Sequence, residues 1–94
     1  MYTRHIETMY RNAALYNLFL AKCRAFAPDL GNDLLALEDA LSARGASLTP
    51  HIPEEEVAAE MARLQSDRGA YEKASQAYSD YCAERHFRRT GSYD

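Results

Sequence analysis

The fold is decided by residues 3–27, which read TRHIETMYRNAALYNLFLAKCRAFA. Apolar side chains recur there at alternating intervals of three and four residues, at Ile6, Met9, Ala13, Tyr16, Leu20, Cys23 and Ala27. On a helix this spacing places them along one side, as in a bundle or coiled coil. Pro28 disfavours helical backbone at the residue before it. The pattern therefore predicts a helix over residues 3–27.

A second set of large apolar residues lies off that stripe, at Tyr10, Leu15, Leu18, Phe19 and Phe26. A helix that is apolar on more than one side is either central in its fold or shared with a partner. Exposing two Leu and two Phe would forgo several kcal/mol at about 25 cal/mol per Å² of apolar surface. We therefore expect a second copy of the chain, or another protein, to cover this face.

The next helix is predicted over residues 30–44. Its apolar stripe consists of Leu30, Leu34, Leu37 and Leu41, while Glu38 and Asp39 face outward. Asp29 or Asn32 can cap its start. Gly45 suits the residue after its end, because glycine readily adopts the left-handed conformation. Residues 46–52 form a loop in which Leu48 and Ile52 turn toward the bundle.

A third, long helix is predicted over residues 53–88. Proline at the first helical position and three glutamates in the first turn favour a helix start at Pro53. A heptad phase then continues through Val57, Met61, Leu64, Arg68, Tyr71, Ser75, Tyr78, Cys82 and Arg85. Gly69 costs about 1 kcal/mol in a helix interior, so a break there is an alternative. Because the phase continues across Gly69, we expect one helix followed by a frayed tail over residues 90–94.

These patterns predict a single all-α domain over residues 1–94, with three helices in a bundle. The second helix is short, and the C-terminal helix would be roughly 50 Å long at 1.5 Å per residue. Two shorter helices do not cover the whole stripe of the long one. We therefore expect dimerisation to complete the bundle.

Composition and charge disfavour several function classes. The chain of 94 residues is 47% hydrophobic, which is too apolar for a disordered protein. Its net charge is −3, with +3 over residues 1–28 and −7 over residues 29–67, so no continuous positive face for nucleic acid is expected. The apolar stretch over residues 13–26 is too short and too interrupted to span a membrane. Without a signal-peptide pattern, a cytoplasmic location is expected.

No arrangement of residues predicts catalysis. His5 and Glu7 point apart on a helix, and His51 lies in a loop between prolines. The sequence has no Ser/His/Asp arrangement and no glycine-rich phosphate loop. We therefore expect no enzyme, no catalytic residue and no cofactor.

The two cysteines leave three alternatives open. Cys82 and His86 stand four residues apart, which places two metal ligands on one helix face, and Cys23 is a conceivable third ligand. Cys23 and Cys82 can also form a disulfide or remain free thiols. We expect free thiols and no metal, since buried free cysteines are common as small hydrophobic residues.

The function predicted from these features is protein–protein interaction: an adaptor, small subunit or inhibitor that occupies a surface of a larger protein and also forms a homodimer. Aromatic residues and arginine are enriched in such interfaces. The predicted partner-binding residues are Tyr10, Leu15, Leu18, Phe19, Phe26, Tyr81, Arg85, Phe87 and Arg88. One alternative is a regulatory nucleic-acid-binding protein that uses the basic run over residues 85–89. A weaker alternative is a metal-binding helical protein.

Overall fold

The computed structural model describes residues 2–46 and 51–91, and all regular structure in these ranges is helical. The elements in chain order are α1 Tyr2–Phe26, the 3-10 turn η1 Pro28–Leu30, α2 Leu34–Ala43, α3 Glu54–Ser66 and α4 Arg68–Thr90. The predicted all-α fold is confirmed. The predicted count of three helices is wrong, because the described residues form four α-helices.

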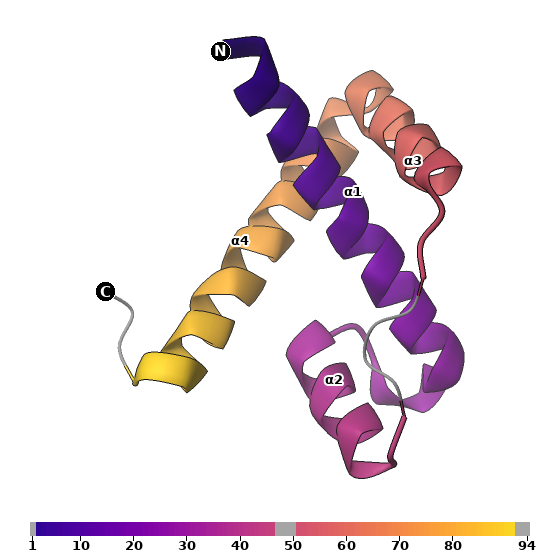
Figure 1. Cartoon of the computed structure of the whole chain (residues 1–94), viewed down its shortest axis with the longest axis vertical. Coiled ribbons are helices and arrows are strands. Elements are labelled where there is room, and N and C mark those ends of the chain that lie inside the picture. Colours follow the sequence, from indigo (N-terminus) through magenta and orange to yellow (C-terminus); the bar gives the residue numbers. More distant parts are fainter. Residues whose placement is uncertain (1, 47–50, 92–94) are drawn as a thin grey trace.

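Helix α1 lies at the centre of the arrangement and contacts each of the other three α-helices. Figure 1 shows α4 crossing α1 and then diverging from it toward the C-terminus, with α2 below the opening between them. The apolar character of α1 on more than one side is thus explained largely within one chain, because different helices cover different sides of it.

The first core cluster joins α1 to α2. Its buried members are Cys23, Ala27, Leu34, Leu37 and Leu41. Three of the four leucines of the predicted stripe are thus buried, while Leu30 is half-buried against the cluster. Ile52 is half-buried, and Leu48 lies outside the described residues.

The start of α2 differs from the prediction. The helix begins at Leu34, and its cap is Asp33 rather than Asp29 or Asn32. The Asp33 carboxylate accepts hydrogen bonds from the amides of Leu35, at 3.1 Å, and Ala36, at 3.3 Å. Gly31 has a φ of +83°, which α-helical backbone does not adopt, so the η1 turn cannot continue into α2. Gly45 follows the end of α2 with a φ of +77°, as predicted.

The second core cluster lies where α3 and α4 pack against α1. Its buried members are Ala13, Ala14, Leu64 and Ala74. The small alanine side chains allow α1 and α4 to approach closely at their crossing. Next to this crossing the rings of Tyr10 and Tyr71 pack together, with centroids 4.3 Å apart.

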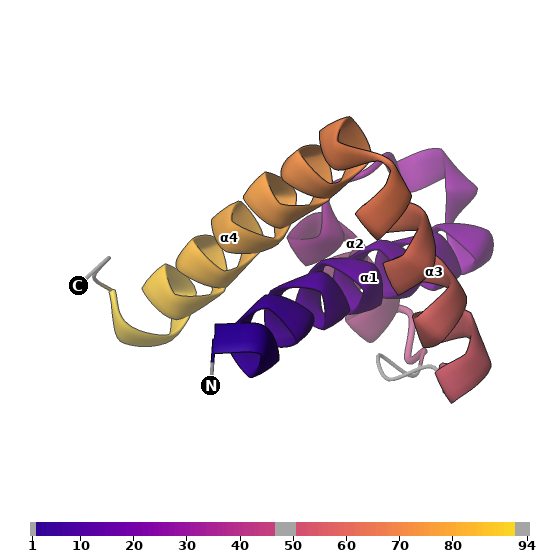
Figure 2. The ribbon, with the colours of Figure 1, turned by 90° about the horizontal axis from the view of Figure 1, so that it is seen from above.

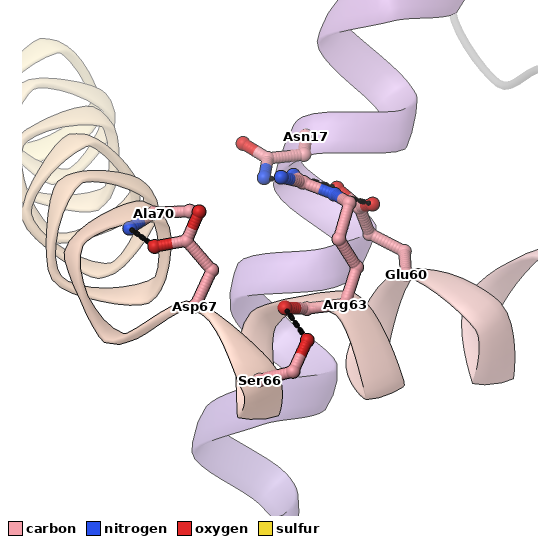
Figure 3. A network of polar contacts seen from close by, with 6 residues as sticks. All are labelled: Asn17, Glu60, Arg63, Ser66, Asp67 and Ala70. Atoms are coloured by element: carbon pink, nitrogen blue, oxygen red, sulfur yellow. Dashed lines mark hydrogen bonds and ion pairs between the residues drawn. The ribbon is translucent and has the colours of Figure 1, made fainter.

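The predicted long helix over residues 53–88 is wrong, because the chain turns at Asp67. The Ser66 hydroxyl donates to the Arg63 carbonyl at 2.9 Å at the end of α3. Asp67 has extended backbone, and its carboxylate caps α4 by accepting from the Ala70 amide at 3.1 Å (Figure 3). Such local side-chain bonds compete with helix continuation. Gly69 is not the break, because it lies inside the first turn of α4.

The turn at Asp67 allows both α3 and α4 to pack on α1. Figure 2 shows a sharp bend in the chain between these two helices when viewed from above. The continuous coiled-coil stripes are therefore not buried along their length: Ile6 and Met9 stay 41% and 39% exposed, and Cys82 and Arg85 are exposed. Helix α4 extends past the predicted end at residue 88 to Thr90 and ends at a left-handed Gly91, while residues 92–94 of the predicted tail lie outside the described residues.

Candidate partner-binding groove

An open groove of about 590 Å³ lies between α1, α2 and α4. Helix α4 diverges from α1 toward the C-terminus (Figure 1), and the residues that line the groove come from these two helices, from α2 and from Ile52. Most of its lining is aromatic or aliphatic, with three polar side chains among them. The lining residues are Asn12, Leu15, Tyr16, Phe19, Leu34, Glu38, Ile52, Tyr78, Tyr81 and Arg85. We call this the α1–α2–α4 groove.

A hydrogen bond between α2 and α4 connects two walls of the groove. The Tyr81 hydroxyl donates to Glu38 Oε1 at 2.6 Å. Arg85 Nη1 donates to the Tyr81 hydroxyl at 3.4 Å, and its guanidinium lies 6.0 Å from the Tyr81 ring centroid. Burial, followed by the bond to Glu38, raises the pKa of Tyr81 to about 12. At neutral pH Tyr81 is therefore a protonated donor that ties the two helices together.

Tyr16 supports the aromatic wall of the groove from α1. Its ring packs edge-on against Tyr78, with centroids 6.2 Å apart, and tilted against Tyr81 at 5.7 Å. Burial is also the main reason that the pKa of Tyr16 is raised. Aromatic rings in such edge-on and tilted contacts support one another. Ring contacts within the chain thus hold the aromatic wall in place.

The structure brings together four of the nine predicted partner-binding residues. Leu15, Phe19, Tyr81 and Arg85 all line the α1–α2–α4 groove. The prediction did not include Tyr78, which was assigned to the seam, or Glu38, which was assigned to the solvent side. Glu38 is in fact half-buried. Its place four residues after Leu34 and three before Leu41 was a signal in the sequence that it borders the packed face of this helix.

The other five predicted residues lie elsewhere. Tyr10 packs against Tyr71, and Arg88 forms an ion pair with Asp39. Phe87 is exposed near the end of α4. Leu18 and Phe26 line a separate hollow of about 490 Å³ together with Ala21, Lys22, Ala25 and Glu56. The predicted residues therefore do not form one continuous surface.

Both cysteines are free thiols: Cys23 is buried and Cys82 is exposed. Burial, more than the nearby Glu38, raises the pKa of Cys23, which keeps this thiol protonated. Within residues 2–46 and 51–91, no three His, Cys, Asp or Glu side chains are grouped as a metal site requires. In the described part of the chain, no third metal ligand is therefore grouped with Cys82 and His86.

The basic run over residues 85–89 is partly engaged within the chain. Arg88 binds Asp39 of α2, and this carboxylate is the main reason that the pKa of Arg88 is raised. The Arg85 guanidinium lies over the Tyr81 ring at the edge of the groove. Arg88 is thus engaged by α2 and Arg85 by Tyr81, so two of the three arginines have partners within the chain.

No family model, curated protein or solved structure matches this chain. Among the described residues, no helix combines the length and the apolar character that crossing a membrane requires. Within residues 2–46 and 51–91, the fold is that of a small all-α protein with four α-helices, and an apolar groove lies between α1, α2 and α4.

Proposed function

We propose that this protein is a small helical interaction module that binds an apolar segment of a larger protein in the α1–α2–α4 groove. The observation that carries the proposal is the groove itself, about 590 Å³ in volume and lined mainly by aromatic and aliphatic side chains. Concave apolar surfaces with a few polar groups are typical of binding sites. An adaptor, small subunit or inhibitor would act through such a surface.

The groove suits an amphipathic helix as the bound segment. Its α1 wall presents Asn12, Leu15 and Phe19, and its α4 wall presents Tyr78, Tyr81 and Arg85. Each set follows a helical spacing of three or four residues, so the groove runs along both helices. A partner helix laid into it would insert apolar side chains at positions i, i+3 or i+4, and i+7. Arg85 at the edge offers a charge-assisted bond to a partner carboxylate.

The proposal is tested by selecting binders from a random peptide library and mapping them by NMR chemical shifts. We expect binders with a helical apolar spacing, and shifts at Leu15, Tyr78 and Tyr81. Leu15→Glu should weaken binding about tenfold or more, since it places a charge against the bound apolar face. Leu18→Glu is the matched control, because Leu18 lies on the same helix, is also half-buried and lines the other hollow.

Two results would contradict this function. One is a library that yields no binder to the folded chain. The other is a set of binders whose shifts gather around Leu18 and Phe26, with affinity lost in Leu18→Glu and kept in Leu15→Glu.

Self-association through the second face of α1 stays a prediction, but this face leaves less apolar surface exposed than the sequence implied. Tyr10, Leu15, Leu18 and Phe19 are each half-buried within their own chain. Phe26, at 70% exposed, is the most exposed large apolar residue of that face.

A further inference from the structure

One flank of α4 carries a stripe whose charge changes sign along the helix. Lys73, Ala77, Asp80 and Glu84 are spaced by four, three and four residues, which places them on one side of α4. The three charged residues are exposed, and Ala77 is half-buried between them. The stripe is therefore basic toward the start of α4 and acidic toward its end.

The basic end of the stripe borders a hollow of about 430 Å³ between α1, α3 and α4. Its lining contains Arg24, Arg63 and Lys73 and no acidic residue. Arg63 is bound to Glu60, with nitrogen–oxygen distances of 2.6 and 2.7 Å (Figure 3). Within the described ranges, Arg24 and Lys73 form no ion pair. Two cations of this hollow are thus available to an incoming negative charge.

The acidic end borders a neighbouring hollow of about 360 Å³. Its lining contains Asp33, Asp80 and Glu84, with Arg88 as the one cation, and Arg88 is bound by Asp39. Asp80 accepts a hydrogen bond from the side-chain amide of Gln76. Because this donor is neutral, the bond does not offset the negative charge of Asp80. Tyr16 and Ala77 line both hollows, so the acidic and basic hollows lie side by side on one face.

We propose that this bipolar face, defined by Lys73, Ala77, Asp80 and Glu84, binds a second copy of the chain. A two-fold symmetric interface must be self-complementary, because the same patch meets itself in reverse. With two α4 helices antiparallel across an axis near Ala77, Lys73 of each copy lies opposite Asp80 of the other. Ala77 at the axis has no long side chain to hold the helices apart.

A second copy fits this face better than an anionic ligand does. A phosphate group would suit the basic hollow, but the adjacent Asp80 and Glu84 would repel it. A second copy places opposite charges at both ends at once. Tyr78 and Arg85 lie on a different side of α4, at 100° of rotation per residue. Tyr16, Leu34 and Tyr81 line both the acidic hollow and the α1–α2–α4 groove, so the dimer would border the groove without covering Tyr78 or Arg85. The inference does not depend on the proposed function.

The test is a charge-swap cycle on the full chain, followed by sedimentation equilibrium from low to high micromolar concentration. The wild-type protein should reach twice the 10.6 kDa chain mass. Lys73→Glu and Asp80→Lys should each weaken the dimer about tenfold or more, since each places like charges opposite one another at two symmetric contacts. A mixture of the two single variants should associate again, and so should the double variant Lys73→Glu plus Asp80→Lys.

Arg89→Glu is the matched control, because Arg89 is an exposed cation of α4 that lies off the stripe. It should leave the dimer dissociation constant unchanged, and circular dichroism should show that every variant keeps its helices. A wild-type protein that remains monomeric throughout would overturn the inference. So would a dimer that resists both single charge reversals but dissociates on Phe26→Glu, which would place the interface on α1. A monomer whose binding of inorganic phosphate is lost in Lys73→Glu would assign the face to an anion and overturn it as well.

Discussion

Replacing Asp67 with alanine tests the turn between α3 and α4. A capped turn and a continuous helix at this position predict opposite changes in the free energy of unfolding. In the structure, the Asp67 carboxylate caps α4 through the Ala70 amide at 3.1 Å. Losing such a cap lowers the free energy of unfolding by about 1 kcal/mol, within a range of about 0.5–2 kcal/mol. If residues 53–88 formed one helix, Asp67 would be an interior helical residue. Alanine there would raise the free energy of unfolding by as much as about 0.7 kcal/mol.

The measurement is unfolding by heat and by urea, followed by circular dichroism. A loss of about 1 kcal/mol lowers the Tm by about 4–8 °C in a domain of this size. Asp67→Asn is the matched control: asparagine caps helices about as well as aspartate, so we expect little change in Tm. An Asp67→Ala protein that is as stable as the wild type, or more stable, would refute the capped turn.

Two further predictions concern backbone conformation and pH. Gly69→Ala should raise the free energy of unfolding by about 0.5–1 kcal/mol, because Gly69 is helical and an added Cβ meets only Asp67 Oδ1 at 3.6 Å. Gly45→Ala should lower the free energy of unfolding, because Gly45 has a φ of +77°. Urea unfolding measures both variants. A Gly69→Ala protein that is less stable than the wild type would indicate that the helix breaks at Gly69. In an alkaline titration of phenolate absorbance, Tyr81 should ionise near its pKa of about 12, and Tyr81→Phe should remove the step at that pH. Because folding raises this pKa, the contribution of Tyr81 to stability is complete below about pH 10 and is lost as the pH rises toward 12. A titration in which Tyr81→Phe removes only a step near pH 10 would argue against the bond to Glu38.

Local spacing was sufficient to predict the first two helices. The apolar repeat before Pro28 corresponds to α1, and Leu34, Leu37 and Leu41 form the buried side of α2. Periodicity succeeds here because an amphipathic helix must bury one side, whatever it packs against. The end of α2 was also predictable, because the positive φ at Gly45 is readily adopted only by glycine.

Periodicity failed at Asp67 because the same heptad phase continues in α3 and in α4. Ser66 and Asp67 are residues that compete with the helix for backbone hydrogen bonds, yet such residues also occur inside helices. What favours the turn is tertiary: it packs Leu64 of α3 and Ala74 of α4 into one cluster on α1. No spacing within a single segment carries that information.

The candidate site, like the fold, could be predicted from the sequence only in part. Spacing along the chain predicts an all-helical protein and a first helix with more apolar surface than one neighbour covers, and Leu15, Phe19, Tyr81 and Arg85 are among the predicted partner-binding residues. That these four line one groove follows from the packing of the helices, because α4 diverges from α1 and Tyr81 bonds to Glu38 of α2. The crossing of two helices depends on which side chains meet at their contact, here the small Ala13, Ala14 and Ala74, and that pairing exists only once the chain has folded.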